Sequence, residues 1–200
     1  YLTGIQQSHT GVEFELSAQL NEMFRLDAGV SMGNWVYTDD ATGTYRDGTE
    51  DKSYSYALKD LKVGDMPQFG MNLGLTVAPV EGAKVQALYR LYALHHADWD
   101  PTSREFSDGE TPDRNPVWRT PKYGILDLNV SYDIPFEFSG VTSQVFLNVI
   151  NALDAVYVQD AADNSKYNAH PWRVGNHTAN AAEVYLGLPT SFNLGLRFNF

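Results

Sequence analysis

Hydrophobic and polar residues alternate along seven segments of this chain. In residues 192–200, Phe and Leu occupy every second position, and Asn, Gly and Arg lie between them. Alternation with a period of two predicts β-strands that have one apolar and one polar face. The same pattern occurs, least cleanly in the last case, in residues 12–20, 24–36, 69–77, 85–91, 126–132 and 145–149. Helical periodicity is hard to find, so the pattern predicts an all-β chain of about seven strands.

The connections between these segments alternate between short and long. Short connections lie around residues 21–22, at 79–82 and at 134–140, whereas long ones cover residues 38–67, 96–121 and 152–189. In an antiparallel up-and-down sheet, this order places every short turn at one end and every long loop at the other. Transmembrane β-barrels of the outer membrane are sorted in this way, with short periplasmic turns and long extracellular loops.

Strand length and aromatic positions fit the same architecture. Strands of about ten residues, at about 3.3 Å per residue and a tilt of about 45°, span the roughly 25 Å apolar band of such a barrel. We expect one girdle of aromatic residues near the long loops, made of Trp35, Tyr37, Phe69, Tyr123 and Phe192. A second girdle near the short turns would contain Phe24, Tyr132, Phe136, Phe138, Phe198 and Phe200.

Composition narrows the choice of function. The chain has a net charge of −11 and a sequence pI near 4.7, which argues against a nucleic-acid partner. It contains no Cys, so disulfides, thiolate metal sites and a Cys nucleophile are excluded. The mean hydropathy is −0.34, and no apolar run is long enough for a transmembrane helix. The three long loops hold 17 acidic and nine basic residues, and therefore most of the negative charge.

The number of strands suggests that the barrel is larger than this chain. Single-chain bacterial barrels have even strand counts, and seven strands do not close one. We therefore expect residues 1–200 to form the C-terminal portion of a larger barrel, without its remaining strands.

Several motifs resemble those of TonB-dependent outer-membrane receptors. LNVINALD at residues 147–154, followed by Val156 and Tyr157, resembles the penultimate-strand pattern L-N-V-x-N-L-F-D-x-x-Y, with Ala152 and Leu153 in place of Leu and Phe. Residues 121–128 resemble the strand start P-x-Y-x-x-x-D-L, and residues 10–16 resemble the G-V-E-x-E strand. Residues 189–200 resemble the last strand and its terminal Phe. Residues 97–101, 118–121 and 157–163 resemble receptors of the Bacteroidetes type.

This resemblance implies a fold and a function. Such receptors are 22-stranded barrels with a plug domain in the lumen. They import scarce ligands such as iron chelates, haem, cobalamin or glycans across the outer membrane of Gram-negative bacteria. The implied partners are the rest of the barrel, the plug, the TonB energy-coupling complex, outer-membrane lipid, an extracellular small molecule and the barrel-assembly machinery, which reads Phe200. The resemblance implies no enzyme activity and no cofactor.

The candidate site residues fall into three groups. Aromatic and Arg side chains commonly anchor binding sites, so candidates for ligand contact in the loops are Trp99, Trp118, Arg119, Tyr157, His170, Trp172 and Arg173. Candidates for the lumen face, where charges contact a plug or pair across strands, are Arg25, Asp27, Gln86, Arg90, Asp127, Asn129, Asn148 and Arg197. Weak candidates for metal binding are His95, His96 and Asp98.

Two other classes of function compete with an importing receptor. A passive porin or a barrel enzyme would use the same wall, and a plug domain encoded upstream would distinguish the receptor from both. A soluble β-sandwich lectin would bury the apolar faces in its core and would need no detergent. No catalytic triad or phosphate-binding pattern is present in the sequence.

Overall fold

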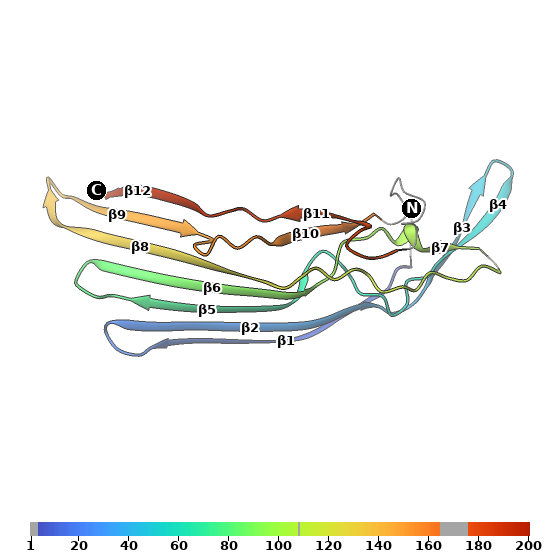
Figure 1. Ribbon diagram of the computed structural model, residues 1–200, viewed down its shortest axis with the longest axis horizontal. Helices are drawn as coiled ribbons and strands as arrows, with labels where there is room; N and C mark the ends of the chain where they lie inside the picture. Colours follow the sequence, from blue (N-terminus) through green and yellow to red (C-terminus); the bar gives the residue numbers. More distant parts are fainter. Residues whose placement is uncertain (1–3, 108, 165–175) are drawn as a thin grey trace.

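Seven antiparallel strands form one continuous sheet in the computed structural model, which describes residues 4–107, 109–164 and 176–200 (Figure 1). They follow one another in chain order as β1 (Gln7–Gln19), β2 (Phe24–Tyr37), β5 (Pro67–Val77), β6 (Ala83–His95), β8 (Tyr123–Phe138), β9 (Val141–Ile150) and β12 (Ser191–Asn199). This result confirms the seven predicted strands and the antiparallel meander. The sheet is not closed, because β1 and β12 are not paired with each other.

Tight turns join the strands at one end of the sheet. Between β1 and β2, the Asn21 side chain accepts hydrogen bonds from the backbone N–H groups of Met23 and Phe24, both at 2.9 Å. Between β8 and β9, Ser139 and Gly140 both have positive φ, as two-residue hairpin turns require. We expected this turn to begin at residue 134, but β8 continues to Phe138. Pro135 has no N–H to donate, and the strand absorbs it as a register irregularity between Ile134 and Phe138.

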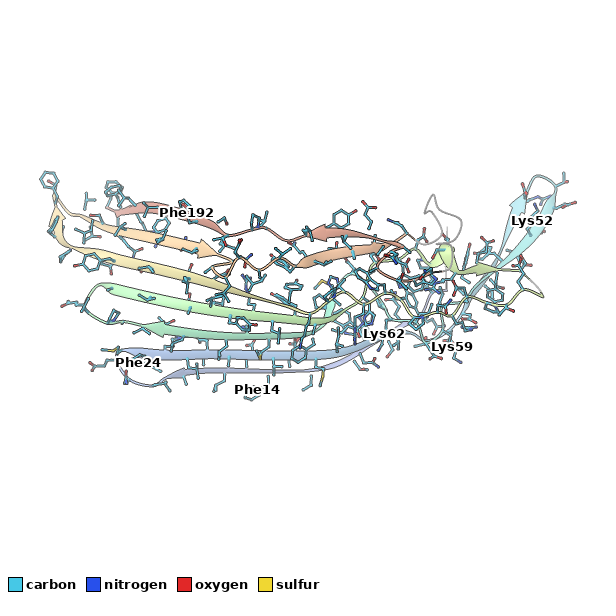
Figure 2. All side chains as sticks on the ribbon, in the orientation of Figure 1. Phe14, Phe24, Lys52, Lys59, Lys62 and Phe192 are labelled. Atoms are coloured by element: carbon cyan, nitrogen blue, oxygen red, sulfur yellow. The ribbon has the colours of Figure 1, made fainter. Side chains whose placement is uncertain are left out.

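The sheet has one apolar and one polar face, and neither carries a second layer in the described part of the chain. Large apolar side chains remain open along the whole sheet, for example Phe14 at 61% and Phe192 at 78% exposure. Figure 2 shows Phe14, Phe24 and Phe192 projecting from the strands. A water-soluble sandwich would cover such a surface, so this single layer fits a wall that faces lipid. No helix in the described ranges is long and apolar enough to cross a membrane.

The prediction of an aromatic girdle near the long loops was wrong for three of its five residues. Trp35, Tyr37 and Tyr123 have the parity of the polar face, because they alternate with outward residues such as Met32 and Leu126 in the same strands. Tyr37 is only 6% exposed and packs among the loops. Aromatic residues near a strand end therefore belong to both faces, and their parity within the strand separates them.

In the described residues, the long connections contain secondary structure of their own. They contain β3 (Ala41–Asp47), β4 (Glu50–Tyr56), the short 3₁₀ helix η1 (Pro101–Arg104), β7 (Glu105–Phe106), β10 (Val158–Asp163) and β11 (Ala182–Leu186). These elements lie together at the end of the sheet opposite the tight turns (Figure 1). Their buried residues form one cluster, here called the loop core: Tyr37, Ala41, Tyr56, Leu58, Leu61, Ala97, Trp99, Val117 and Ala161.

Candidate functional site

All eight candidates for the lumen share the polar face of the sheet. Strand registers connect one row across five strands, made of Arg25, Thr76, Gln86, Asn129 and Asn148. Residues directly opposite one another in antiparallel strands lie on the same face. The other candidates occupy positions of the same parity, namely Asp27, Arg90, Asp127 and Arg197.

Four of the five charged candidates on the polar face are paired with one another. Arg25 forms an ion pair with Asp27 at 2.9 Å, and Ser17 of the neighbouring strand donates a hydrogen bond to Asp27 at 2.6 Å. Arg90 of β6 pairs with Asp127 of β8. These four charges therefore stabilise the wall itself. They differ from unpaired charges, which would be available to bind a plug domain.

Polar contacts continue toward the C-terminal edge of the sheet. Asn129 donates to Gln86 at 3.3 Å across β6 and β8. Arg197 donates to Gln144 at 3.3 Å, and its guanidinium lies 5.8 Å from the centre of the Phe146 ring. Phe146 covers the backbone of Gly195 on the neighbouring strand, which explains why the alternation in this strand is less clean.

A shallow hollow of about 290 Å³ lies beside these pairs on the polar face. Gly29 and Ser31 of β2 and Gly70 and Asn72 of β5 line its floor, and Arg90 and Tyr92 border it on β6. Glu13 and Glu15 of β1 border its other side, and neither takes part in the ion pairs formed by the described residues. The hollow therefore has one uncompensated acidic wall.

Three tyrosine rings contact one another in a row where the polar face meets the loops. Tyr92 of β6 lies opposite Tyr123 of β8, with ring centres 5.3 Å apart. Tyr157, which precedes β10, stacks on Tyr123 at 4.5 Å with an interplanar angle of 24°. We call these three residues the tyrosine ledge. All are half-buried, so each keeps part of its ring accessible. Sequence analysis singled out Tyr157, but it missed Tyr92 and assigned Tyr123 to the lipid interface.

The loop core contains Trp99. This side chain is 6% exposed, donates from Nε1 to the carbonyl of Lys62 at 3.0 Å and meets the Tyr37 ring edge-on at 5.1 Å. The structure thus gives Trp99 a packing role between two loops, with little surface for a ligand. Trp118 is half-buried against the loop core, whereas Arg119 is exposed.

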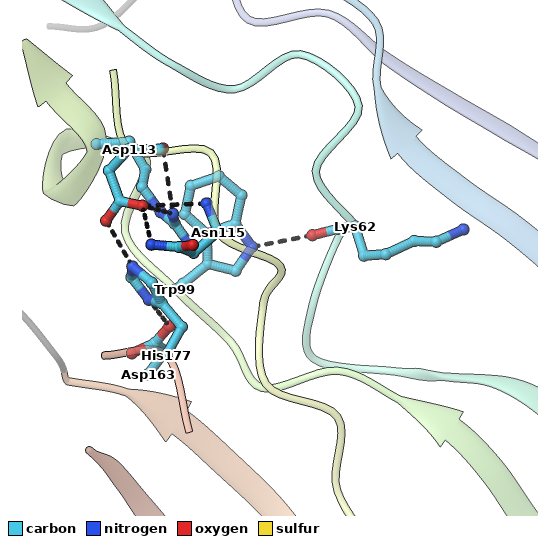
Figure 3. A network of polar contacts seen from close by, with 7 residues as sticks. Lys62, Trp99, Asp113, Asn115, Asp163 and His177 are labelled. Carbon is cyan, nitrogen blue, oxygen red and sulfur yellow. Dashed lines mark hydrogen bonds and ion pairs between the residues drawn. The ribbon is translucent and has the colours of Figure 1, made fainter. Parts of the chain in front are cut away.

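A buried network of charges joins two of the long loops (Figure 3). His177 Nδ1 lies 2.5 Å from Asp163 Oδ2, and His177 Nε2 lies 2.8 Å from Asp113 Oδ2. Arg104 Nη1 lies 3.1 Å from Asp113 Oδ1, and its guanidinium is 5.4 Å from the centre of the Trp99 ring. Sequence analysis missed Asp113 and Asp163 as partners of His177, and Arg104 as a partner of Asp113, because no local pattern relates these positions.

Hydrogen bonds shift the pKa values in this network. Burial lowers the pKa of His177, but hydrogen bonds to Asp163 and Asp113 outweigh it and raise the pKa above 6.5. Burial raises the pKa of Asp113, but hydrogen bonds from His177 and Asn115 leave it below 3.8. The geometry therefore favours the charged forms of both side chains.

A second ion pair joins the β2–β5 loop to the β6–β8 loop. Arg114 donates to both carboxylate oxygens of Asp40, at 3.0 and 2.5 Å, and Asp40 also accepts from the backbone N–H groups of Leu58 and Lys59. The hydrogen bond from Arg114 holds the pKa of Asp40 below its usual value. All three long loops are thus connected into one unit.

The metal candidates do not gather into a ligand set. His95 is 3% exposed, and neither ring nitrogen has a hydrogen-bond partner; its closest carboxylate oxygen is that of Asp160, at 3.8 Å. Burial lowers the pKa of His96 to about 4, helped by Lys62 and Arg119, and Asp98 is exposed. Within the described residues, no group of three potential ligands is placed to hold a metal ion.

His170, Trp172 and Arg173 lie outside the described residues. Phe200 follows β12, and its side chain is completely exposed.

Comparison with known proteins identifies the family. The model of the TonB-dependent receptor-like β-barrel family matches residues 2–152, which is more than half of the chain. Comparisons with curated proteins and with solved structures find no match. The sheet, its two faces and the loops at one end agree with this family assignment. The chain therefore belongs to the TonB-dependent receptors, a family of outer-membrane transporters of Gram-negative bacteria, and forms part of their β-barrel.

Proposed function

We propose that this chain forms part of a receptor that binds a scarce nutrient outside the cell and imports it actively. The ligand would be an iron chelate, haem, cobalamin or a glycan. The observation that carries this proposal is the tyrosine ledge, at the junction between the joined loops and the polar face. A ligand that passes from the loops into the lumen meets these rings first, and aromatic rings commonly anchor ligands in binding sites.

The open sheet also indicates what the chain contacts in the complete receptor. We propose that residues 1–200 are the C-terminal portion of a 22-stranded barrel, whose other strands pair with the free edges of β1 and β12. The apolar face contacts lipid, and Phe200 is available to the assembly machinery. A plug domain fills the lumen and couples the receptor to TonB. The unpaired carboxylates of Glu13 and Glu15 support contact with cationic groups of this plug.

Active import can be tested in cells that express the full chain containing these residues. Uptake of a ferric catecholate, haemin, cyanocobalamin and maltoheptaose would be measured with and without a protonophore. We expect one of these probes to accumulate above its external concentration, and we expect the protonophore or loss of TonB to abolish this. Uptake of all the probes that is proportional to concentration and insensitive to the protonophore would instead identify a passive porin.

The ledge gives a specific prediction for ligand affinity. Tyr123→Ala removes the central ring, which stacks on Tyr157 and contacts Tyr92 at a tilt. Aromatic contacts contribute about 0.5–1.5 kcal/mol each, so we expect the dissociation constant of the imported probe to rise roughly 2- to 12-fold. Tyr132→Ala is the matched control, because Tyr132 lies on the other face of the same strand. Equal loss of affinity in both variants would contradict a ligand site at the ledge.

A further inference from the structure

A hollow at the loop end of the sheet is lined by basic residues. Its volume is about 470 Å³, and Trp118, Arg119 and Lys122, which precede β8, line it together with Ala93 and Leu94 of β6. Arg119 and Lys122 are both exposed, and neither forms an ion pair with any described residue. Among the described residues, no acidic side chain lines the hollow, although the long loops are acidic as a whole.

The basic residues are held in an extension of the sheet. An isolated β-bridge pairs His96 with Arg119, and the N–H of Thr120 donates to the carbonyl of His95 at 2.8 Å. Both contacts continue the register of β6 with β8 beyond the ends of the two strands. Lys122 lies between this bridge and the start of β8. Backbone pairing therefore fixes the positions from which both basic side chains extend.

The same register places the hollow on the apolar side of the wall. Lys122 directly precedes Tyr123, so it has the parity of Leu126 on the apolar face. Continued to this level, the register sets Lys122 opposite Ala93, which itself lies opposite Phe69 of that face. The rings of the tyrosine ledge occupy the polar face at this level, and they do not line the hollow. The hollow therefore opens where the apolar face meets the loops.

Basic side chains also determine the electrostatics of this corner. Burial lowers the pKa of His96 to about 4, and the nearby positive charges of Lys62 and Arg119 contribute to this shift. His96 is therefore neutral at neutral pH. Lys62 donates its hydrogen bond to the side chain of Asn34, a neutral amide that leaves the ammonium charge uncompensated. The local potential is thus positive, and it favours an anionic partner.

A membrane lipid has the chemistry that this position requires. A lipid that packs its acyl chains on the apolar face places its headgroup where that face ends, which is the level of Arg119 and Lys122. Headgroup phosphates are anionic, and guanidinium and ammonium groups bind them through charge-assisted hydrogen bonds. Trp118 is half-buried beside the two basic residues, and Trp rings are enriched at the interface between membrane and water.

We propose that Arg119 and Lys122, beside Trp118, form a binding site for the phosphate groups of a lipid in the outer leaflet. This inference rests on the proposed contact between the apolar face and lipid, and it is independent of import. It assigns Trp118 and Arg119 to the outside of the wall, in contrast to the expectation from sequence that they contact the imported ligand. The site anchors the loop end of the wall at the level of the headgroups.

The experiment measures lipid binding to the full receptor in detergent by native mass spectrometry. The probes are lipid A with both of its phosphates, the same lipid without phosphates, and inorganic phosphate as a competitor. We expect the phosphorylated lipid to bind at least about 10-fold more tightly than the dephosphorylated lipid, because only the former pairs with both basic residues. Inorganic phosphate should displace it only at a large excess.

Three outcomes would overturn the proposal in distinguishable ways. Equal affinity for the two lipids would show that the hollow does not recognise phosphate, while lipid contact of the apolar face would stand. Displacement by an equal concentration of inorganic phosphate would assign the site to a soluble anion. Binding of neither lipid would contradict the lipid contact of the apolar face, on which the inference rests.

Charge variants test the two residues directly. Each basic residue near a membrane surface contributes about 5-fold in affinity, so Arg119→Gln combined with Lys122→Gln should weaken binding of the phosphorylated lipid roughly 30-fold. Binding of the dephosphorylated lipid should not change. Arg119→Lys combined with Lys122→Arg keeps both charges and should retain most of the affinity.

Lys59→Gln is the matched control, because Lys59 is an exposed residue of the β2–β5 loop that does not line the hollow. It should bind the phosphorylated lipid as the parent does. Parent-like affinity in the double Gln variant, or an equal loss in Lys59→Gln, would overturn the proposal.

Discussion

Val130→Arg is expected to impair assembly of the receptor strongly, whereas Asn129→Arg in the adjacent position is expected to be tolerated. Val130 is 39% exposed near the middle of β8 and shares the apolar face with Val85 and Leu147. An Arg near the bilayer midplane on the lipid face of a barrel costs about 2–4 kcal/mol. Asn129 lies on the polar face opposite Gln86, where a charge remains in contact with water or polar groups.

This prediction can be measured on the full receptor in outer membranes. The readouts are the amount of membrane-integrated protein and the urea concentration at which half of it unfolds. The two variants add the same charge to neighbouring positions of one strand, so a general effect of Arg on β8 would affect both. A larger loss for Asn129→Arg would mean that the polar face meets lipid and that the wall is oriented the other way.

Trp99→Ala is expected to loosen the packing between the β2–β5 and β6–β8 loops without unfolding the sheet. Truncation of a buried Trp to Ala typically costs about 3–5 kcal/mol, because the cavity collapses only in part. Trp99 contacts the Tyr37 ring and the Arg104 guanidinium, and it donates a hydrogen bond to the backbone carbonyl of Lys62. One substitution therefore removes contacts to the end of β2, to the β2–β5 loop and to η1.

Hydrogen exchange distinguishes this outcome from global unfolding. The amide of Ala97 donates to the carbonyl of Trp118 within the β6–β8 loop, and the amide of Asp98 donates to the carbonyl of Ala161 in the β9–β12 loop. Both amides should lose at least about 100-fold in protection. Amides between β5 and β6 should exchange as in the parent. Leu153→Ala is the control, because Leu153 is 65% exposed. Equal loss of protection in the loops and in the sheet would show that both unfold together.

The sequence by itself predicted the wall well, because its pattern is local. A period of two in each strand identifies the strand and separates its faces, and this predicted Arg25, Asn129 and Arg197 on one face before any register was known. The alternation of short and long connections likewise gave the meander. The family resemblance found in the motifs was confirmed over residues 2–152.

The predictions of the turn after β8 and of the aromatic girdle were less accurate, and each error has a physical reason. The turn was expected at residues 134–140, but β8 stays paired with β9 beyond Pro135, with a register irregularity between Ile134 and Phe138. Tyr123 was assigned to the lipid face from its position near a strand end, although its parity places it beside Tyr92. Parity is local information that was available in the sequence, so this residue could have been assigned correctly.

The sequence alone thus determined the strands, their two faces and the family, because these depend on neighbours along the chain. Only the tertiary structure decided that the long loops fold into one unit with a buried core. The pairs Arg114–Asp40 and His177–Asp113 span 74 and 64 residues, and no periodicity relates such positions. Their contacts depend on how three loops meet at one end of the sheet. Charged side chains ordinarily prefer water. The charges of these two pairs can lie between the loops because each has a partner of opposite sign.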